Sequence, residues 1–509
     1  MNQRPSAQPL DRSRTHSAAH FSALFEPRGV VVAGASTHPG KFGFVSLHNI
    51  LSCGYSGRVF ATNRDGSEVL GIQCLESVAE LPEGEVDLMF VCTPKATVPD
   101  LLRQAASRGV RAAFLTTAGY GESGPAGLQD ERDLVALAEE LDILLVGPNG
   151  QGVVSTPASL CAQIVAPYPP SGSIGVASQS GNFVSSFLNW SCATGVGISR
   201  AVSAGNAAAT TVGDLLDYFS TDDATAVALA YLEGIEDGRA VAGSFERVAA
   251  QMPLVVLKGG ATSGGANAAA SHTGALATDD RAFDGMCAQT GATRAATVSE
   301  AFEAAATFAT QPLPTGNRVV VMTTAGGWGV VTADAITRHR DLELLALPED
   351  LREAIDDHLP PRWSRNNPVD LAGGETRDTI PDVLQLIAQH PEVDAIIHLG
   401  LGIQANQARM LRTGGFYGDE GHDPHGIQRI VAYHERQDAR FAVAAAEISA
   451  ATGKPILTAT ELAVAFPENP GPAAVREAGR LCYASADQAV TALGHLVRRA
   501  RYLRRRTGA

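Results

Sequence analysis

Short runs of apolar, largely β-branched residues alternate along the chain with longer amphipathic stretches. The first third holds five such runs, at Arg28–Ala33, Arg58–Thr62, Asp87–Cys92, Arg111–Thr116 and Ile143–Val146. Stretches with helical periodicity, such as Val98–Arg108 and Leu128–Glu140, separate several of them. Strands that alternate with helices are typical of βαβ units around a parallel sheet. The pattern therefore predicts an α/β domain of the Rossmann type over residues 21–150.

The same alternation occurs twice more. The second set has strands at Ser173–Ala177, Ile198–Ser203, Thr225–Tyr231 and Leu254–Lys258, and the third has strands at Arg318–Met322, Ala395–Leu399 and Pro455–Leu457. Linkers rich in Pro and Gly, at Pro169–Gly172 and Gln311–Asn317, separate the sets. We predict three consecutive α/β domains, at 21–150, 151–311 and 317–509, after a disordered tail at 1–20. The last element is a helix from Ala486 to about Leu503.

Composition and charge exclude several classes of protein. The 509 residues are 45% hydrophobic and 18% charged, which suits several ordinary cores. A net charge of −15 disfavours nucleic acid as a partner. The seven cysteines include no CxxC pair, so neither a disulfide framework nor a zinc site fits. With no signal peptide in Met1–His20 and no run of about 18 apolar residues, we expect a soluble, cytoplasmic protein without membrane contact.

A glycine-rich turn directly follows the first predicted strand and opens a helix; it contains Gly34, Ser36, Gly40 and Gly43. Backbone amides in such a turn can approach a phosphate at the positive end of the helix. The second strand runs into Asn63 and Arg64, with no acidic residue to bind a ribose, which disfavours NAD and suits an additional phosphate. The turn indicates a phosphorylated nucleotide, and packing of strand against helix is the alternative explanation.

The second domain has two turns of related form. Ser178–Asn182 leads from a strand into a helix, so the amides of Ser180, Gly181 and Asn182 would face a bound anion. Ser203–Asn206 closes another strand and would lie at the same edge of the sheet. Taken alone, both turns are weak indications of a site.

The segment Ser271-His272-Thr273-Gly274 follows a stretch from Gly259 made almost wholly of small residues. An imidazole can attack phosphorus when a carboxylate holds its other nitrogen. Glu233, just after a predicted strand, is placed to do so. The alternative is an exposed loop histidine, but the nearby carboxylate and anion-binding turn favour catalysis. By contrast, we assign Gly414–Gln437, which contains His422 and His425, to a surface loop and predict no metal site.

In combination, these motifs resemble the ADP-forming acyl-CoA synthetases, relatives of succinyl-CoA synthetase. The resemblance covers about residues 20 to 500 and rests on Val32–Ser36, Pro39-Gly40, Gly43, Thr93-Pro94, Ala118–Glu122, Gly147–Asn149, Ser178–Gly181, Ser203–Asn206, Glu233-Gly234, Ser271–Gly274 and Asn367–Leu371. Two positions depart from the family pattern. Asp65 stands where the family has Lys, and Trp328 stands where it usually has Pro.

The resemblance implies roles for particular residues. His272 would be the phosphohistidine, and Glu233 would orient it. Phosphate and the acyl group would meet Asn149, Ser178, Gln179, Ser180, Gly181, Asn182, Gly205 and Asn206. Coenzyme A would lie on Gly34, Ala35, Ser36, Gly40, Gly43, Asn63, Arg64, Thr93, Pro94, Ala118 and Gly119. The resemblance also implies that the second and third domains are flavodoxin-like, as in succinyl-CoA synthetase.

The family reaction is acyl-CoA + ADP + phosphate ⇌ carboxylate + CoA + ATP, through an acyl phosphate and a phosphohistidine. Fused members continue into an ATP-grasp domain, whereas this chain ends at Ala509 after a helix. We therefore expect an α subunit in a hetero-oligomer, with ADP or ATP and Mg²⁺ on a separate ATP-grasp β subunit and a small carboxylic acid as substrate. The arginines between Arg498 and Arg506 could dock that partner or complement the dipole of the helix.

Three other functions remain open at this stage. The chain could be a CoA or acyl-CoA sensor that no longer turns over, although the intact His272 and Glu233 argue against decay. Lysine acetyltransferases that share these domains lack the histidine and carry an extra domain. A plain NAD-dependent oxidoreductase is disfavoured by the missing acidic residue after the second strand.

Overall fold

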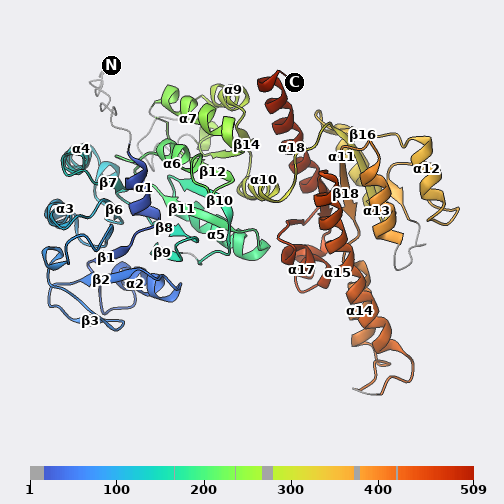
Figure 1. Cartoon of the computed structure of the whole chain (residues 1–509), viewed down its shortest axis with the longest axis horizontal. Helices are drawn as coiled ribbons and strands as arrows, with labels where there is room; N and C mark the ends of the chain where they lie inside the picture. The colour runs from blue at the N-terminus through green and yellow to red at the C-terminus, as the bar shows by residue number, and fades with distance from the viewer. Residues whose placement is uncertain are drawn as a thin grey trace. The chain divides into compact units, whose positions relative to one another are not determined.

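The computed structural model describes residues 16–165, 167–235, 237–265, 279–371, 379–419 and 422–508. The described chain forms two compact units (Figure 1). The first takes in the residues up to Val165 together with Gln179–Gly181 and Val202–Tyr218, and the second takes in the rest. Among the described helices, none has both the length and the apolar character that crossing a membrane requires.

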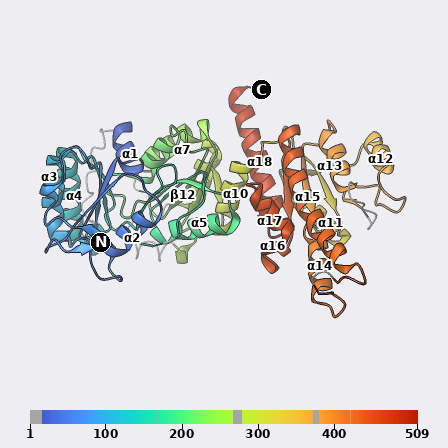
Figure 2. The ribbon, with the colours of Figure 1, turned by 60° about the horizontal axis from the view of Figure 1, so that its bottom comes forward.

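The first unit is built on a five-stranded parallel sheet with strand order β2-β1-β5-β6-β7. These strands are β1 (Gly29–Ala33), β2 (Arg58–Thr62), β5 (Leu88–Val91), β6 (Ala112–Leu115) and β7 (Leu144–Val146). The helices between them are α2 (Phe42–Ser52), α3 (Val98–Ser107) and α4 (Pro125–Glu140), of which α3 and α4 lie side by side (Figures 1 and 2). Because helices cover both faces, β1, β5, β6 and β7 are buried throughout.

The order of the strands indicates where a ligand-binding crevice would lie in the first unit. The chain moves from β1 to one neighbour, β2, and then returns to the other side of β1 as β5. In doubly wound sheets, ligands bind at the carboxyl ends of the strands where the winding direction reverses. Here that point lies between the ends of β1 and β5, beside Gly34 and Thr93.

Smaller elements complete the first unit. They are α1 (Ala18–Phe25), the antiparallel pair β3 (Glu68–Val69) and β4 (Ile72–Gln73), the 3₁₀ turns η1 (Val78–Glu80), η2 (Lys95–Thr97) and η3 (Gly121–Ser123), the antiparallel pair β8 (Gly152–Ser155) and β9 (Leu160–Gln163), and nearly all of α6 (Val212–Phe219). Helix α1 corrects the predicted tail, because its residues 18–20 were placed there. Buried Phe21, Leu24 and Phe25 explain why this segment is ordered.

The second unit contains two sheets. In the first of them β14, β13, β12, β10 and β11 are successive neighbours. The bounds are β10 (Ser171–Ser178), β11 (Ile198–Ser203), β12 (Val227–Leu232), β13 (Leu254–Lys258) and β14 (Thr293–Ala295). The associated helices are α5 (Gly181–Thr194), α7 (Gly238–Gln251), α9 (Asp280–Thr290) and α10 (Val298–Thr310).

The other sheet of this unit has the order β16-β15-β18-β19-β20, with β17 also paired to β15. Its strands are β15 (Arg318–Thr323), β16 (Glu343–Leu344), β17 (Val369–Asp370), β18 (Ala395–Leu399), β19 (Ile456–Ala459) and β20 (Cys482–Tyr483). Its helices are α11 (Gly326–Arg338), α12 (Glu349–Asp356), α13 (Thr379–Gln389), α14 (Ile403–Thr413), α15 (Ile427–Thr452), α16 (Leu462–Ala465), α17 (Pro470–Glu477) and α18 (Ala486–Thr507).

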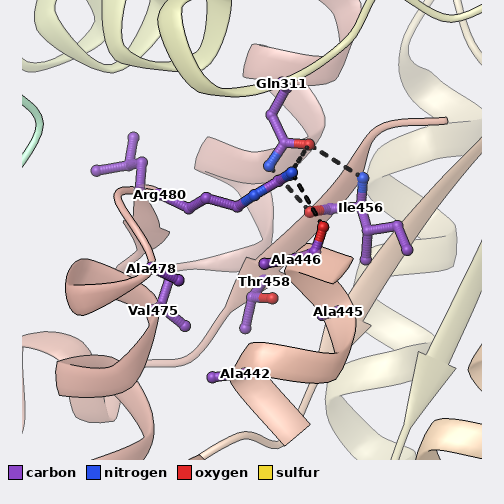
Figure 3. Close-up of a pocket in the computed structure, with 10 residues that line it drawn as sticks. Gln311, Ala442, Ala445, Ala446, Ile456, Thr458, Val475, Ala478 and Arg480 are labelled. Atoms are coloured by element: carbon purple, nitrogen blue, oxygen red, sulfur yellow. Dashed lines mark hydrogen bonds between the residues drawn. The ribbon is translucent and has the colours of Figure 1, made fainter. Parts of the chain in front are cut away.

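Gln311, just after α10, ties the two sheets of the second unit together. Its amide donates to the carbonyl of Ile456 at 3.0 Å, and its oxygen accepts from the Ile456 amide at 3.2 Å. Arg480 donates to the same Gln311 oxygen at 3.0 Å and to the Ala446 carbonyl at 3.2 Å (Figure 3). Nearby, Thr307 of α10 and Tyr483 of β20 share a buried hydrogen bond of 2.5 Å.

The predicted fold class, three successive α/β domains, is confirmed. The boundaries at 150/151 and 311/317 remain our proposal. A second prediction is also wrong: Ile427–Gln437, assigned to a surface loop, belongs to α15. Ile427, Ile430 and Val431 carry the spacing of a helix, but the prediction grouped them with the glycine-rich stretch that precedes them.

The C-terminal arginines make contacts within the second unit. Arg498 and Arg501 both pair with Asp341, at 3.1 and 2.7 Å. Arg499 is buried and donates to the carbonyl of Ala249 at 2.5 Å. Arg504, in the last turn of α18, donates to the carbonyl of Thr315 at 3.0 Å. These four side chains therefore have internal partners, whatever the role of Arg505 and Arg506.

Candidate active site

The turn after β1 has the close packing that its glycines predict. Gly34 has φ +91°, and a Cβ there would lie 2.9 Å from the carbonyl oxygen of Cys92 and 2.7 Å from the Thr93 methyl. The amides of Gly34 and Ala35 both donate to the Thr62 carbonyl, at 3.0 and 2.9 Å. A Cβ on Gly43 would overlap the Gly34 carbonyl. Glycine at these positions therefore lets the ends of β1, β2 and β5 meet at the start of α2.

The remaining predicted residues of this turn are exposed or half-buried. The Ser36 hydroxyl accepts from the His38 amide at 3.1 Å, and His38 Nδ1 accepts from the Gly40 amide at 3.0 Å. The turn therefore holds its own shape without a ligand. A phosphate bound here would have to displace the His38 ring to reach the Gly40 amide.

Asn63 and Arg64 follow β2 at the same edge. The Asn63 side-chain amide donates to the carbonyl and the hydroxyl of Ser67, both at 3.0 Å. Its buried Oδ1 has no hydrogen-bond partner within the part of the chain that the structure describes. Arg64 is exposed. Asn63 thus shapes the turn, and Arg64 is the residue that can reach an anion outside it.

The turns after β5 and β6 are tied together. The Thr117 hydroxyl donates to the Thr93 carbonyl at 2.8 Å, and Lys95, next to Pro94, donates to the Gly119 carbonyl at 2.6 Å. Lys95 also pairs with Asp130 at 2.5 Å. Pro94 and Ala118 are exposed. Thr93, Pro94, Ala118 and Gly119, predicted from separate motifs, therefore lie at one edge of the sheet.

Three further predicted residues come together in the first unit. The Asn206 amide donates to the Pro148 carbonyl at 3.0 Å, and the Asn149 side chain donates to Asn206 Oδ1 at 3.3 Å. A Cβ on Gly205 would overlap the Pro148 carbonyl. Gln179, Ser180 and Gly181 also belong to this unit, where Gln151 packs against Gly181.

In the second unit, a candidate site lies at the carboxyl ends of β10, β12 and β13. Ser178 ends β10, is fully buried and is paired in register with Tyr231. Glu233 follows β12, and Gly259 follows β13 with its amide donating to the Leu232 carbonyl at 2.8 Å. A Cβ on Gly259 would lie 2.7 Å from the Tyr231 hydroxyl and 3.6 Å from Glu233 Cγ. The predicted carboxylate thus lies beside the start of the glycine-rich stretch.

Tyr231 is a site residue that sequence reasoning missed. Burial, the Glu233 charge and a hydrogen bond from its phenol to the Glu233 carboxylate all raise the pKa of Tyr231. Its ring stacks on Phe183 of α5 at a centroid distance of 3.9 Å. The signal was available: residues two apart at a strand end share a face, so Tyr231 and Glu233 point the same way.

Lys258, the last residue of β13, was also missed as a functional position. It is buried, and its ammonium donates to the Gly259 and Gly260 carbonyls at 3.2 and 3.4 Å. It lies 3.5 Å from Asp280 Oδ1 at the start of α9. A hydrogen bond from Arg294 lowers the pKa of Asp280, although burial raises it. The Lys258 ammonium therefore holds in place the backbone that follows β13 at Gly259 and Gly260.

His272 and the motif Ser271–Gly274 lie outside the described residues, so the structure does not test them. Asn182, also predicted, is exposed in the first turn of α5. Within the described ranges, no group of three or more His, Cys, Asp or Glu could hold a metal ion.

Three family models match the chain in succession. Residues 28–156 match a CoA binding domain, residues 171–308 a succinyl-CoA ligase like flavodoxin domain, and residues 319–404 a Ligase-CoA domain. The order agrees with the three predicted domains. It also agrees with a CoA crevice in the first of them.

Two relatives are named as α subunits of ADP-forming acetate–CoA ligases I and II of Pyrococcus furiosus. They are 36% and 37% identical over 380 and 375 residues, which is 74% of this chain in both cases and 82% and 81% of theirs. ADP-forming acetate–CoA ligase I of Archaeoglobus fulgidus is 36% identical over 374 residues but is matched over only 54% of its own length.

A solved structure is similar over nearly the whole chain. It is the dinucleotide forming acetyl-coenzyme A synthetase 1 of Ca. Korarchaeum cryptofilum in complex with phosphate and ADP, with a TM-score of 0.79 and 28% identity, covering 96% of this chain and 99% of that one. These similarities favour a ligase over a sensor and confirm the resemblance drawn from the motifs. The chain belongs to the ADP-forming acyl-CoA synthetase family.

Proposed function

We propose that this chain is the α subunit of a cytoplasmic ADP-forming acyl-CoA synthetase that catalyses acyl-CoA + ADP + phosphate ⇌ carboxylate + CoA + ATP. One observation carries the proposal. Glu233 lies beside Gly259, at the strand end from which the chain continues towards Ser271–Gly274. A carboxylate and a histidine motif joined in this way suit a phosphohistidine enzyme.

The first step takes place between acyl-CoA and phosphate. CoA binds at the carboxyl edge of the first sheet, with its phosphates near Gly34, Ala35 and Arg64. A phosphate oxygen attacks the thioester carbonyl, the C–S bond breaks, and the CoA sulfur leaves with the electron pair and takes up a proton. The amides at the start of α5 stabilise the negative charge of the acyl phosphate because they lie at the positive end of the helix.

In the second step, the free imidazole nitrogen of His272 attacks the phosphorus and the carboxylate leaves with the P–O electron pair. Glu233 accepts a hydrogen bond from the other ring nitrogen and stabilises its developing positive charge. Tyr231 donates to Glu233 and fixes its direction. The phosphoryl group then passes to ADP on an ATP-grasp β subunit, where Mg²⁺ would neutralise the nucleotide phosphates.

Phosphorylation of the purified chain tests this proposal. With acetyl-CoA and ³²P-phosphate, wild type should acquire an acid-labile, base-stable label that His272→Ala lacks. His425→Ala, which removes an exposed histidine, serves as control and should label normally. Glu233→Gln should label at least about tenfold more slowly while binding CoA as well as wild type. A labelled His272→Ala variant would refute the phosphohistidine, and a selective loss of CoA binding in Glu233→Gln would refute the role of Glu233.

A further inference from the structure

The side-chain amide of Asn206 lies between two carboxylates. Its nitrogen is 2.6 Å from Glu122 Oε2 and 2.7 Å from Glu131 Oε2. A primary amide has two N–H groups, so both are used. The amide can therefore have only one orientation, with Oδ1 turned towards Asn149. We call Glu122, Glu131, Asn149 and Asn206 the Asn206 cluster.

The two carboxylates are themselves held by the turn after β6. Glu122 Oε1 accepts from the amides of Gly119 and Tyr120, the latter at 3.2 Å. Glu131 Oε2 accepts from the Gly121 amide at 3.1 Å. Burial raises the pKa of Glu122, but hydrogen bonds from Asn206 and from these amides outweigh it and leave the pKa below its ordinary value. Glu122 is thus a charged carboxylate that accepts hydrogen bonds from the Asn206 side chain and from two backbone amides.

On its other side, Asn206 holds the turn after β7. Its backbone amide donates to the Pro148 carbonyl at 3.0 Å, and the Ala208 amide donates to the Gly147 carbonyl at 3.2 Å. Asn149 has φ +60°, an uncommon value for a residue with a side chain, and is exposed. The turns after β6, β7 and β11 therefore meet at one amide.

We propose that Glu122 and Glu131 are positioning residues, which fix Asn206 and through it present Asn149 to the acyl group or the attacking phosphate. The inference rests on the proposed function for the identity of that substrate. Asn206 does not donate its side-chain N–H groups to substrate, because both belong to the carboxylates. Asn149 is the member of the cluster that meets the substrate.

Exchanging donor and acceptor tests the cluster. Asn206→Asp places a third carboxylate against Glu122 and Glu131, so it should displace Asn149. Adding Glu122→Gln should restore the contact, because the introduced glutamine would keep its oxygen for the Gly119 and Tyr120 amides and donate an N–H to the introduced aspartate. With acetyl-CoA and ³²P-phosphate, we expect labelling of Asn206→Asp to slow at least about tenfold. The double variant should recover at least about threefold of that loss, but not all of it, because Glu131 still opposes the introduced aspartate.

Two controls separate positioning from loss of structure. Asp133→Asn removes one charge from the exposed face of α4, where Asp133 accepts from Gln129, and should label like wild type. The Kd for CoA should change by less than the labelling rate in every variant, because the turn at Gly34–Gly43 is not altered and only Ala118 and Gly119 of the predicted CoA residues adjoin the cluster. Labelling of Asn206→Asp at the wild-type rate, or a double variant no better than the single one, would overturn the inference.

Hydrogen exchange of the backbone amides tests the Asn206 cluster without a measurement of enzyme activity. The amides of Gly119, Tyr120 and Gly121 should exchange faster in Asn206→Asp. Those of Gly119 and Tyr120, which donate to residue 122, should slow again in the double variant. If wild type takes up no label, the proposed function fails, and the exchange rates still decide the cluster. Exchange in Asn206→Asp as slow as in wild type would then overturn it.

Discussion

At the scale of single residues, the candidate CoA crevice depends on the absence of side chains. Gly43 sits in the first turn of α2, where a Cβ would overlap the Gly34 carbonyl. Gly34 in turn adopts a positive φ and lies against Cys92 and Thr93. The two glycines let a helix start directly on a turn between strands, which brings the positive end of the helix to the carboxyl edge of the sheet, where a phosphate can bind.

Gly43→Ala should therefore lower stability and weaken CoA binding. The added methyl must push α2 away from the turn, at a cost of about 1–3 kcal/mol. Denaturant unfolding and calorimetric titration with CoA measure both effects. Gly285→Ala is the matched control: it lies in α9 with open space around its Cβ, so it should gain about 0.5–1 kcal/mol. Unchanged CoA affinity in Gly43→Ala would contradict this account of the turn.

At the scale of elements, α10 and α18 pack together around buried carboxylates. Gln488 of α18 donates to Glu303 of α10 at 2.9 Å, and His495 contacts Glu300 at 3.0 Å. Burial, followed by the charge of Glu300, raises the pKa of Glu303 to about 7. The packing of these two helices therefore becomes sensitive to pH between 4.5 and about 7.

The sign of this effect follows from proton linkage. Between the ordinary pKa of 4.5 and about 7, the folded state keeps a proton on Glu303 that the unfolded state releases, so stability falls as pH rises and is level above 7. Glu303→Gln should remove the penalty while its oxygen still accepts from Gln488. We expect the variant to be more stable by up to about 3 kcal/mol at pH 8 and by far less at pH 5.

Denaturant unfolding at the two pH values checks this expectation. Glu246→Gln is the control, because Glu246 is exposed on α7 and its replacement should not change stability at either pH. A difference between Glu303→Gln and wild type that is the same at pH 5 and pH 8 would show that Glu303 titrates normally.

At the scale of the whole molecule, family membership and the turns of the first unit point to the same ligand. The CoA binding domain matched over residues 28–156 contains the turns at Gly34, Arg64 and Thr93. No carboxylate ends β2, where a dinucleotide ribose would need one. CoA, rather than a nicotinamide nucleotide, is therefore the expected ligand of the first unit.

CoA should accordingly raise the melting temperature of the full chain, while NADH should not. A ligand at 100 times its Kd stabilises the folded state by about 2.7 kcal/mol, which a thermal scan resolves. In Gly43→Ala the shift with CoA should shrink. Stabilisation by NADH, with none by CoA, would contradict the assignment of the crevice.

Local patterns were enough to predict the three sheets and most of their strands. Ile198–Ser203, Leu254–Lys258 and Ala395–Leu399 were predicted with the bounds that the structure has. Strand and helix periods, together with Gly and Pro at turns, are short-range signals, so one chain carries them without its folded context. The same signals located Gly34, Ser178 and Glu233 at strand ends, and the motifs identified the family.

Tertiary structure alone decided which of these residues act on one another. Glu131 contacts Asn206 across 75 positions of sequence, and Tyr231 reaches Gly259 only because β12 and β13 are neighbours. Partners across a sheet edge depend on strand order and on which side chains share a buried space. The periodicity of the sequence specifies neither the strand order nor the shared buried space. The Asn206 cluster could therefore be identified only from the tertiary structure.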